Sequence, residues 1–224
     1  MKVMILAAGR GMRLRPVTDR VPKPLVEAGG KALLAWHLER LAQAGLRDLV
    51  INVSHLGEMI EQRFGNGAGW GVNIAWSREA EPLDTAGGLA QARQLLGPDP
   101  FLLVNGDIWC DYDFSRLRAA RLGAGLAHLV LAPNPPHAAQ GDFSLRDGRV
   151  GNAAAPRYTY TGIALLSPRL LAGVAPGEKA PLAPLLRAAA ARGEISGELF
   201  RGLWRDAGTA ERLAELDALL HQRG

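Results

Sequence analysis

The stretch at residues 4–16 reads Met-Ile-Leu-Ala-Ala-Gly-Arg-Gly-Met-Arg-Leu-Arg-Pro, and Pro-Lys-Pro-Leu follows at 22–25. An apolar run that fits a buried strand leads directly into a loop broken by Gly9 and Gly11. Glycine lets successive backbone N–H groups face inward, and such a concave set of amides binds phosphate oxygens. Arg13 and Lys23 add full positive charges. The stretch therefore predicts a strand followed by a polyphosphate-binding loop, in preference to an ordinary basic surface loop.

Two common phosphate-binding motifs do not describe this loop. No Gly-Lys-Ser/Thr follows the glycines, so the loop is not a Walker loop. The third glycine of a dinucleotide-binding fingerprint is also missing, and the loop is more basic and longer than that motif.

Composition sets the class of protein. The chain has 224 residues, of which 48% are hydrophobic, and a formal net charge of +4. This length fits one α/β domain with a sizeable core, and no apolar run is long enough to span a bilayer. The cations are scattered without interleaved aromatic residues, which argues against nucleic-acid binding. The lone Cys110 is expected to pack as a small apolar residue, and His37 and His55 are expected at a helix surface or in a loop.

Short apolar runs alternate with helical patterns through the first part of the chain. This rhythm predicts a doubly wound α/β domain with a mostly parallel central sheet. The expected strands are 3–7, 49–53, 72–76, 101–104 and 126–132, and the expected helices are 33–44, 57–64, 87–96 and 114–122.

The remainder of the chain has a different pattern. Residues 134–151 are rich in Pro, Gly and His, and the short apolar pieces 143–145 and 149–150 predict a small antiparallel ribbon on the substrate side. Residues 158–166 fit a half-buried strand. Helices are expected at 182–191 and 210–221.

A carboxylate follows the buried strand 101–104. Asp107 comes directly after Asn105-Gly106, at the sheet edge where open α/β proteins bind their ligands. A carboxylate beside a polyphosphate needs a cation between them, and Mg²⁺ suits one or two carboxylates plus phosphate oxygens. A simple turn after a strand is the alternative explanation.

Three motifs together resemble the sugar-1-phosphate nucleotidyltransferase family. Its signature, Gly-x-Gly-Thr-Arg-Leu-x-Pro-x-Thr and then Pro-Lys-Pro, matches residues 9–18 and 22–24 with Met12 in place of the Thr. The segment 79–88, Glu-Ala-Glu-Pro-Leu-Asp-Thr-Ala-Gly-Gly, is similar to the base-recognition loop, and 204–209 is similar to Trp-x-Asp-x-Gly-Thr. The resemblance implies the nucleotide-diphospho-sugar transferase fold, with Arg13 and Lys23 as catalytic residues. It also implies that Mg²⁺ is the cofactor and that Asp107 and Asp206 hold it.

The resemblance also implies two sets of binding residues. For the nucleotide they are Ala8, Gly9, Gly11, Met12, Arg13, Lys23, Glu79, Glu81, Gly87 and Gly88. For the sugar they are Asn105, Gly141, Asp142, Tyr160, Thr161 and Gly162. We expect one domain over 1–224, with 1–132 mainly binding the nucleotide and 133–224 mainly binding the sugar.

Several stretches look most like compact family members that use UTP and N-acetylmuramate α-1-phosphate. They are 104–109, 111–114, 141–143 and 182–187. The resemblance implies uridylyl transfer giving UDP-N-acetylmuramate and pyrophosphate, in recycling of cell-wall peptidoglycan. The lactyl carboxylate of this sugar calls for a cation, for which Arg201 and Lys179 are candidates.

Other functions stay open at this point. Glu79 suits guanine at least as well as uracil, which favours guanylyl transfer to mannose or heptose 1-phosphate, and thymidylyl transfer to glucose 1-phosphate is a further choice. A nucleotide-binding regulatory subunit is the non-enzyme alternative. The expected partners are small molecules, without nucleic acid or membrane, and the expected state is a cytoplasmic monomer or small homo-oligomer.

Overall fold

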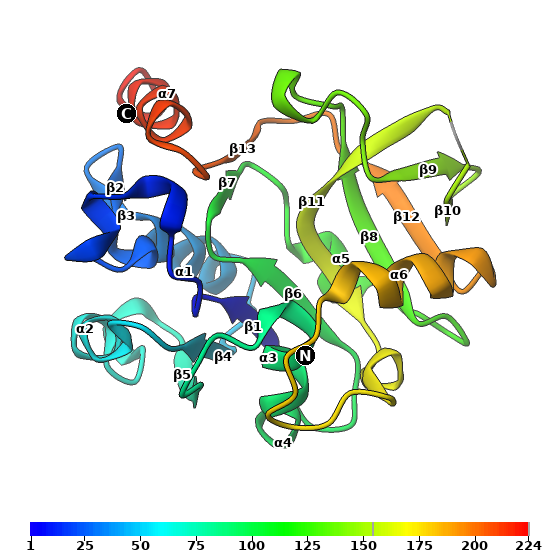
Figure 1. Ribbon diagram of the computed structural model, residues 1–224, viewed down its shortest axis with the longest axis horizontal. Coiled ribbons are helices and arrows are strands. Elements are labelled where there is room, and N and C mark those ends of the chain that lie inside the picture. Colours follow the sequence, from blue (N-terminus) through cyan, green and yellow to red (C-terminus); the bar gives the residue numbers. More distant parts are fainter. Residues whose placement is uncertain (154, 224) are drawn as a thin grey trace.

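A nine-stranded sheet organises the chain. In the computed structural model, which describes residues 1–153 and 155–223, its strand order is β5-β4-β1-β6-β11-β8-β12-β10-β9 (Figure 1). The strands are β1 Val3–Leu6, β4 Asp48–Val53, β5 Asn73–Arg78, β6 Phe101–Asn105, β8 Ala127–Ala132, β9 Phe143–Arg146, β10 Arg149–Gly151, β11 Arg157–Leu166 and β12 Ile195–Leu199.

One strand near the centre of the sheet, β11, runs opposite to the strands on both sides of it. Strands β5, β4, β1 and β6 are parallel to one another. Strand β11 is antiparallel to both its neighbours, β6 and β8, and β12 is again parallel to β8. The ribbon of β9 and β10 is antiparallel, as predicted, and it joins the sheet through pairings with β11 and β12.

Helices cover both faces of the sheet. Residues of β1 alternate between the two faces, so that Val3 and Ile5 pack on one side and Met4 on the other. The first core contains α1 Leu33–Gln43, α2 Gly57–Phe64 and α5 Ser115–Ala119. The second contains α3 Asp84–Gln91, α4 Arg93–Leu96 and α6 Leu182–Ala191.

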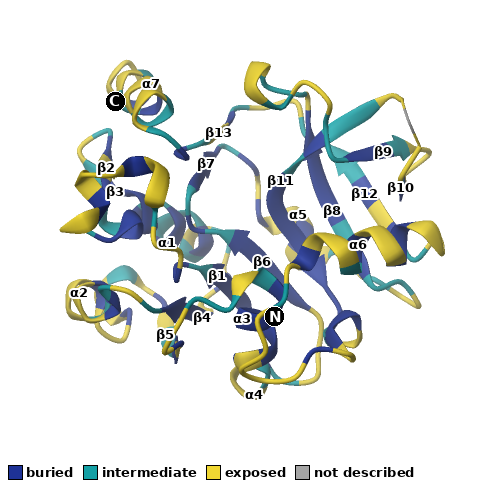
Figure 2. Cartoon of the chain, viewed as in Figure 1, coloured by how far each residue is buried: buried dark blue, intermediate teal, exposed yellow. Residues whose placement is uncertain are grey.

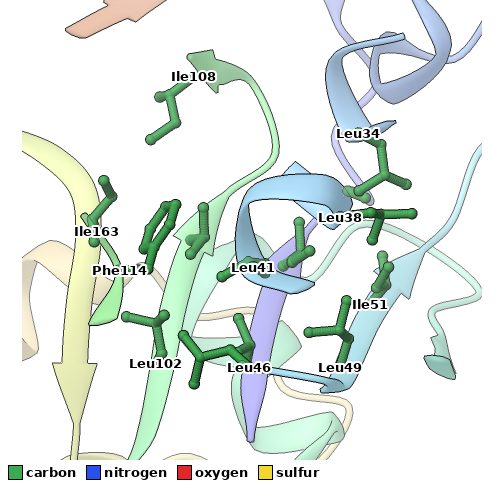
Figure 3. Packing of buried hydrophobic residues seen from close by; sticks show 14 of the residues in the cluster. Leu34, Leu38, Leu41, Leu46, Leu49, Ile51, Leu102, Ile108, Phe114 and Ile163 are labelled. Carbon is green, nitrogen blue, oxygen red and sulfur yellow. The ribbon is translucent and has the colours of Figure 1, made fainter. Parts of the chain in front are cut away.

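The first core shows how the sequence pattern of α1 is used. Leu34, Leu38 and Leu41 lie on one face of the helix at a spacing of three to four residues and point toward the sheet (Figure 3). They are fully buried in the same cluster as Ile51 of β4. Figure 2 shows the same division over the molecule, with buried central strands and exposed outer faces on α2, α6 and α7.

Two small sheets lie beside the large one. Strands β2 Glu27–Ala28 and β3 Lys31–Ala32 form a hairpin, on which α7 Ala210–His221 packs through Leu216 and Leu220. Strand β7 Ile108–Cys110 pairs with β13 Trp204–Asp206, which brings together two segments far apart in the chain.

Most predicted elements are confirmed, and the differences are informative. Helices 57–64, 182–191 and 210–221 have the predicted bounds. The predicted helix 87–96 instead begins at Asp84 and is divided into α3 and α4, and the predicted helix 114–122 is shortened to α5 because Ala120 has an extended backbone. Strands β2, β3, β7, β12 and β13 were not predicted. Among the described residues, no helix is long and apolar enough to cross a membrane.

Candidate active site

A cavity of about 570 Å³ opens where β1 and β6 end. Its wall includes residues 6–9 after β1, residues 105–107 after β6, and residues 82–85 at the start of α3. Asp142 and Phe143 from the ribbon, Tyr160 of β11 and the first turns of α6 close the other side. The two halves of the chain therefore share one cavity, at the sheet edge that the sequence predicted.

The glycine loop is held by its own backbone. Gly11 has φ +62°, and its carbonyl accepts hydrogen bonds from the Leu14 N–H and the Thr18 hydroxyl, both at 2.8 Å. A Cβ on Gly11 would lie 2.7 Å from Thr18 Cγ2, so this turn requires glycine. Gly9, by contrast, lines the cavity, and a Cβ there would meet nothing within 4 Å. Ala8 and Gly9 reach the cavity, while Gly11 shapes the turn behind them.

The arginines of this loop lie outside the cavity wall. Arg10 pairs with Glu81 at 2.5 Å, and Arg15 pairs with Asp19 at 2.9 Å. Met12 and Arg13 are exposed, and neither lines the cavity. The structure thus leaves the predicted phosphate contacts Met12 and Arg13 outside the cavity wall, and their roles stay predictions.

Lys23 and Asp107 form the charged centre of the cavity. Lys23 Nζ lies 2.7 Å from Asp107 Oδ2, and the lysine side chain is only 10% exposed. The short 3₁₀ turn of Lys23–Leu25 carries the lysine inward, while Asp107 stands just after β6. Gly106 permits this approach, because a Cβ there would lie 2.5 Å from the Leu6 carbonyl oxygen. Both residues line the cavity, where the ammonium can meet an anionic ligand.

The second predicted metal ligand lies beside the first along the backbone. In the β7–β13 ladder Asp206 is opposite Ile108, and the Ala207 N–H donates to the Asp107 carbonyl at 2.8 Å. Asp206 Oδ1 accepts from Arg212 at 2.5 Å, and His137 Nε2 lies 2.9 Å from Oδ2. Asp206 does not line the cavity wall.

These two carboxylates fit the donor chemistry of Mg²⁺, which takes one or two protein carboxylates and completes its shell with water and phosphate oxygens. Within residues 1–153 and 155–223, no group of three or more His, Cys, Asp or Glu side chains forms a metal cage. A cation at this place would thus take most of its oxygen ligands from the substrates. It would also replace Lys23 and Arg212 as the neighbours of the two acids.

Glu79, a predicted nucleotide contact, connects three segments of the cavity wall by hydrogen bonds. Its Oε1 accepts from Asn52 Nδ2 at 2.6 Å, and its Oε2 accepts from the Leu83 N–H at 3.0 Å. Asn52 Oδ1 in turn accepts from the Ala7 N–H at 2.8 Å. Glu79 is 6% exposed and lines the cavity, but each of its oxygens already accepts a hydrogen bond. The carboxylate therefore holds the base loop to the end of β1.

The glycines of the base loop serve close packing. A Cβ on Gly87 would lie 2.2 Å from the Glu178 carbonyl oxygen, and one on Gly88 would lie 2.6 Å from Glu79 Oε1. Neither glycine lines the cavity, and Glu81 is also outside its wall. Leu83, Asp84 and Thr85 take that position instead, and Asp84 has φ +58°.

Among the predicted sugar contacts, the backbone of β11 shapes the cavity wall. Asp142 Oδ2 accepts from the Tyr160 N–H at 2.8 Å, and both residues line the cavity. The Tyr160 hydroxyl is buried without a hydrogen-bond partner among the described residues, and burial raises the pKa of this tyrosine. A buried hydroxyl without a partner is uncommon in proteins, and this one belongs to a residue that lines the cavity.

The other predicted sugar contacts support this wall from behind. A Cβ on Gly162 would lie 2.5 Å from Asn105 Nδ2, so glycine lets the Asn105 amide sit against β11, where it lines the cavity. The Thr161 hydroxyl donates to the Val130 carbonyl at 2.7 Å. Gly141 occupies a tight turn with φ +61°. Thr161, Gly162 and Gly141 do not line the cavity.

Two other titratable side chains are buried in the first core. Burial lowers the pKa of His37 to about 4 and raises the pKa of Cys110 to about 11. Cys110 packs as a small apolar residue, as predicted. His37 is only 2% exposed, so its predicted surface position is wrong: its side chain is buried next to Ile108 of β7. His55 is exposed in a turn, as predicted.

A mixed sheet covered by helices on both faces, with a cavity at the ends of β1 and β6, agrees with the expected nucleotide-diphospho-sugar transferase fold. The sequence model of the nucleotidyl transferase family matches residues 2–141, and this chain belongs to that family. An N-acetylmuramate alpha-1-phosphate uridylyltransferase of Neisseria meningitidis serogroup B is 48% identical over 98% of both chains. A mannose-1-phosphate guanyltransferase of Yarrowia lipolytica is 47% identical over 120 residues, 52% of this chain and 33% of that protein. The chain spans about a third of that guanyltransferase.

Solved structures show the same fold. A putative glucose-1-phosphate thymidylyltransferase from Bacillus anthracis, in complex with a sucrose, superposes with a TM-score of 0.88 and 21% identity, covering 99% of this chain and 95% of that one. A UDP-glucose pyrophosphorylase complexed with UDP-glucose gives a TM-score of 0.81 at 17% identity, covering 100% of this chain and 99% of that one.

Proposed function

We propose that this protein transfers a uridylyl group from UTP to N-acetylmuramate α-1-phosphate, giving UDP-N-acetylmuramate and pyrophosphate. The observation that carries the proposal is the 48% identity to a uridylyltransferase of that specificity, which extends over 98% of both chains. The guanyltransferase match is similar in identity but spans only 52% of this chain. Specificity for the sugar depends on residues throughout the cavity, so the match over the full length is the better guide.

The reaction needs positioning and charge neutralisation more than proton transfer. An oxygen of the sugar phosphate attacks the α-phosphorus of UTP, the bond from that phosphorus to the bridging oxygen breaks, and pyrophosphate leaves with the bond's electrons. The attacking oxygen is already anionic, so no general base is required. The main barrier is bringing two anions together in line, which enzymes meet by orientation and fixed positive charge.

Lys23 is the cavity residue best suited to that task. Its side chain is held in a nearly buried position by Asp107, at 2.7 Å. We assign it to the sugar phosphate and the α-phosphate, whose repulsion it lowers as they approach. The backbone amides near Ala8 and Gly9 and the guanidinium of Arg13 would receive the leaving pyrophosphate.

Asp107 and Asp206 are the residues that would hold a divalent cation, for which we propose Mg²⁺. When bound, this ion supplies Lewis-acid polarisation of the α-phosphate and neutralises its charge. Asp107 would then exchange the Lys23 ammonium for the ion, which frees the lysine for the substrates. Asp206 would exchange Arg212 in the same way.

A panel of substrates tests the proposal. The purified protein is incubated with Mg²⁺, each nucleoside triphosphate and a set of sugar 1-phosphates, and released pyrophosphate is measured. We expect the highest kcat/KM for UTP with N-acetylmuramate α-1-phosphate. Activity only with GTP and mannose 1-phosphate would instead establish the guanylyltransferase alternative, and activity only with dTTP and glucose 1-phosphate the thymidylyltransferase alternative. Binding of nucleotides without turnover of any pair would favour a regulatory subunit.

The cellular setting follows from these substrates. We propose a cytoplasmic enzyme of peptidoglycan recycling that meets its substrates as free small molecules, acting as a monomer or small homo-oligomer. Within it, we assign residues 1–132 mainly to the nucleotide and 133–224 mainly to the sugar. Light scattering of the purified protein measures the oligomeric state directly.

A further inference from the structure

One cation on the sugar side of the cavity has no role in the mechanism above. Arg187 lies on α6 and lines the cavity together with Asp142, Phe143 and Tyr160. Its guanidinium carbon lies 5.5 Å from the centre of the Phe143 ring. A guanidinium stacked on an aromatic face keeps its N–H edge free for a planar anion.

Arg187 differs in this respect from the other cation of the cavity wall. Lys23 is paired with Asp107. Arg187 takes part in no ion pair with any residue of the described ranges 1–153 and 155–223. Asp142, the acid on this side, instead accepts a hydrogen bond from the Tyr160 N–H. The structure thus holds a planar cation, unpaired and oriented, at the sugar end of the cavity.

The proposed sugar has a group that matches this cation. N-acetylmuramate differs from N-acetylglucosamine by a lactyl ether, which ends in a carboxylate. Moving that carboxylate from water into a partly enclosed cavity is unfavourable unless a cation meets it, the more so because Asp142 is already there. Arginine is suited to a carboxylate, because two parallel N–H donors match its two oxygens.

We propose that Arg187 recognises the lactyl carboxylate and so sets the preference for the muramate sugar, an inference that rests on the proposed function. The sequence suggested Lys179 and Arg201 for this role, but neither lines the cavity. Arg187 thus contacts the lactyl group and selects the sugar, whereas Lys23 contacts the reacting phosphates.

The test pairs a change in the protein with a matching change in the substrate. Pyrophosphate release with saturating UTP is measured for N-acetylmuramate α-1-phosphate and for its lactyl carboxamide, which has nearly the same shape without the charge. The protein variants are Arg187→Met, which keeps an apolar stem on Phe143, Arg187→Lys, and the control Arg192→Ala. Arg192 lies just past the same helix, exposed and paired with Glu194.

We expect Arg187→Met to lower kcat/KM for the carboxylate substrate about 10- to 100-fold, mainly through KM, and to leave the carboxamide almost unchanged. Arg187→Lys should recover part of the loss, and Arg192→Ala should match the wild type. Equal losses on both substrates, or an unaltered preference for the carboxylate, would overturn the role of Arg187.

The two proposals fail in different ways. A wild type that uses UTP with the carboxylate and the carboxamide equally well retains the uridylyltransferase function and removes the inference about Arg187. A wild type that turns over neither with UTP removes both. Thermal unfolding of each variant, expected near the wild-type midpoint, separates loss of recognition from loss of fold.

Discussion

Lys23 shows how a single residue becomes useful through its surroundings. Prolines on both sides of it set a short turn that directs the side chain inward, where it is 10% exposed and paired with Asp107. A lysine in such a place loses much of its hydration, so its attraction to phosphate is less screened than at a surface. The same carboxylate that keeps the lysine in place is the one we assign to the metal.

We predict that Lys23→Met and Asp107→Asn each lower kcat by roughly 10²- to 10³-fold, because each removes charge stabilisation near the reacting phosphate. Pyrophosphate release under saturating substrates measures the effect. Lys31→Met, which breaks the more exposed ion pair with Glu39 at 2.6 Å, is the matched control and should retain activity. Turnover near the wild-type rate in either site variant would refute these roles.

Gly162 is important because its lack of a side chain leaves space for the Asn105 amide. Its φ of +80° and a clash of 2.5 Å with Asn105 Nδ2 both oppose any side chain. We predict that Gly162→Ala displaces the Asn105 amide from the cavity wall, raises KM for the sugar phosphate, and destabilises the fold by about 1–3 kcal/mol. Gly173→Ala is the control, since a Cβ there meets nothing within 4 Å. Urea unfolding measures the loss of stability, and initial rates measure KM for the sugar phosphate. If Gly162→Ala equals Gly173→Ala in both, the prediction is wrong.

At the scale of elements, the helices and strands that could be predicted are those whose own residues carry a recognisable pattern. Helix 182–191 is rich in Leu and Ala, and helix 210–221 begins after Thr209, whose hydroxyl accepts from the Arg212 N–H. Strands β7 and β13 are three residues long and are stabilised by each other across 94 or more residues of chain. Their pattern is too short to be read locally, and so their existence could not be predicted, although Asp107 and Asp206 beside them could.

The residues predicted for the candidate site fall into two groups, those that line the cavity and those that support its wall. The motifs led to Gly9, Lys23, Asp107 and Asp142, all of which line the cavity. They also led to Thr161, Gly87 and Gly88, which support the wall from behind. A motif marks residues that a site needs, but only the coordinates separate those that face the ligand from those that position their neighbours. Arg187 ends the stretch 182–187 that carries part of the resemblance, but the sequence assigned it no role, and its place in the cavity wall over Phe143 distinguishes it from other exposed arginines.

Glu79, which follows β5, accepts the hydrogen bonds that connect β4 to the predicted base loop. Both Asn52 Nδ2 and the Leu83 N–H donate to Glu79, so a Gln there would turn one N–H₂ donor toward another donor. We predict that Glu79→Gln raises KM for UTP more than KM for the sugar phosphate and costs about 1–3 kcal/mol of stability. Two-substrate kinetics and urea unfolding measure this, with the exposed Glu58→Gln as control. An equal rise in both KM values would argue against a role confined to the nucleotide side.

For the whole molecule, the sheet joins two halves through one reversed strand. Strand β11 of the second half lies between β6 and β8 of the first half, and its Tyr160 lines the cavity while Gly162 leaves room for Asn105. The alternation of strands and helices predicted a mostly parallel sheet but gave no sign of this reversal, because direction depends on pairing between distant segments. The consequence is that residues from both halves of the chain line one cavity over a single hydrogen-bonded sheet.

Acid stability is the property of the whole molecule that the buried His37 should control. Its pKa is about 4 in the fold against 6.5 when exposed, mainly because of burial; the neighbouring Asp107 raises it and Arg40 lowers it. Between pH 4 and 6.5, His37 therefore binds a proton in the unfolded chain but stays neutral in the folded chain. The stability is fully present above pH 6.5 and falls as the pH is lowered toward 4, with a loss on the order of a few kcal/mol.

We predict that His37→Asn, which cannot be charged, is less stable than the wild type at pH 7 but shows a flatter dependence of stability on pH between pH 6.5 and 4. Urea unfolding at several pH values measures the slope, with the exposed His55→Asn retaining the wild-type slope; an unchanged slope in His37→Asn would mean that other groups govern acid unfolding.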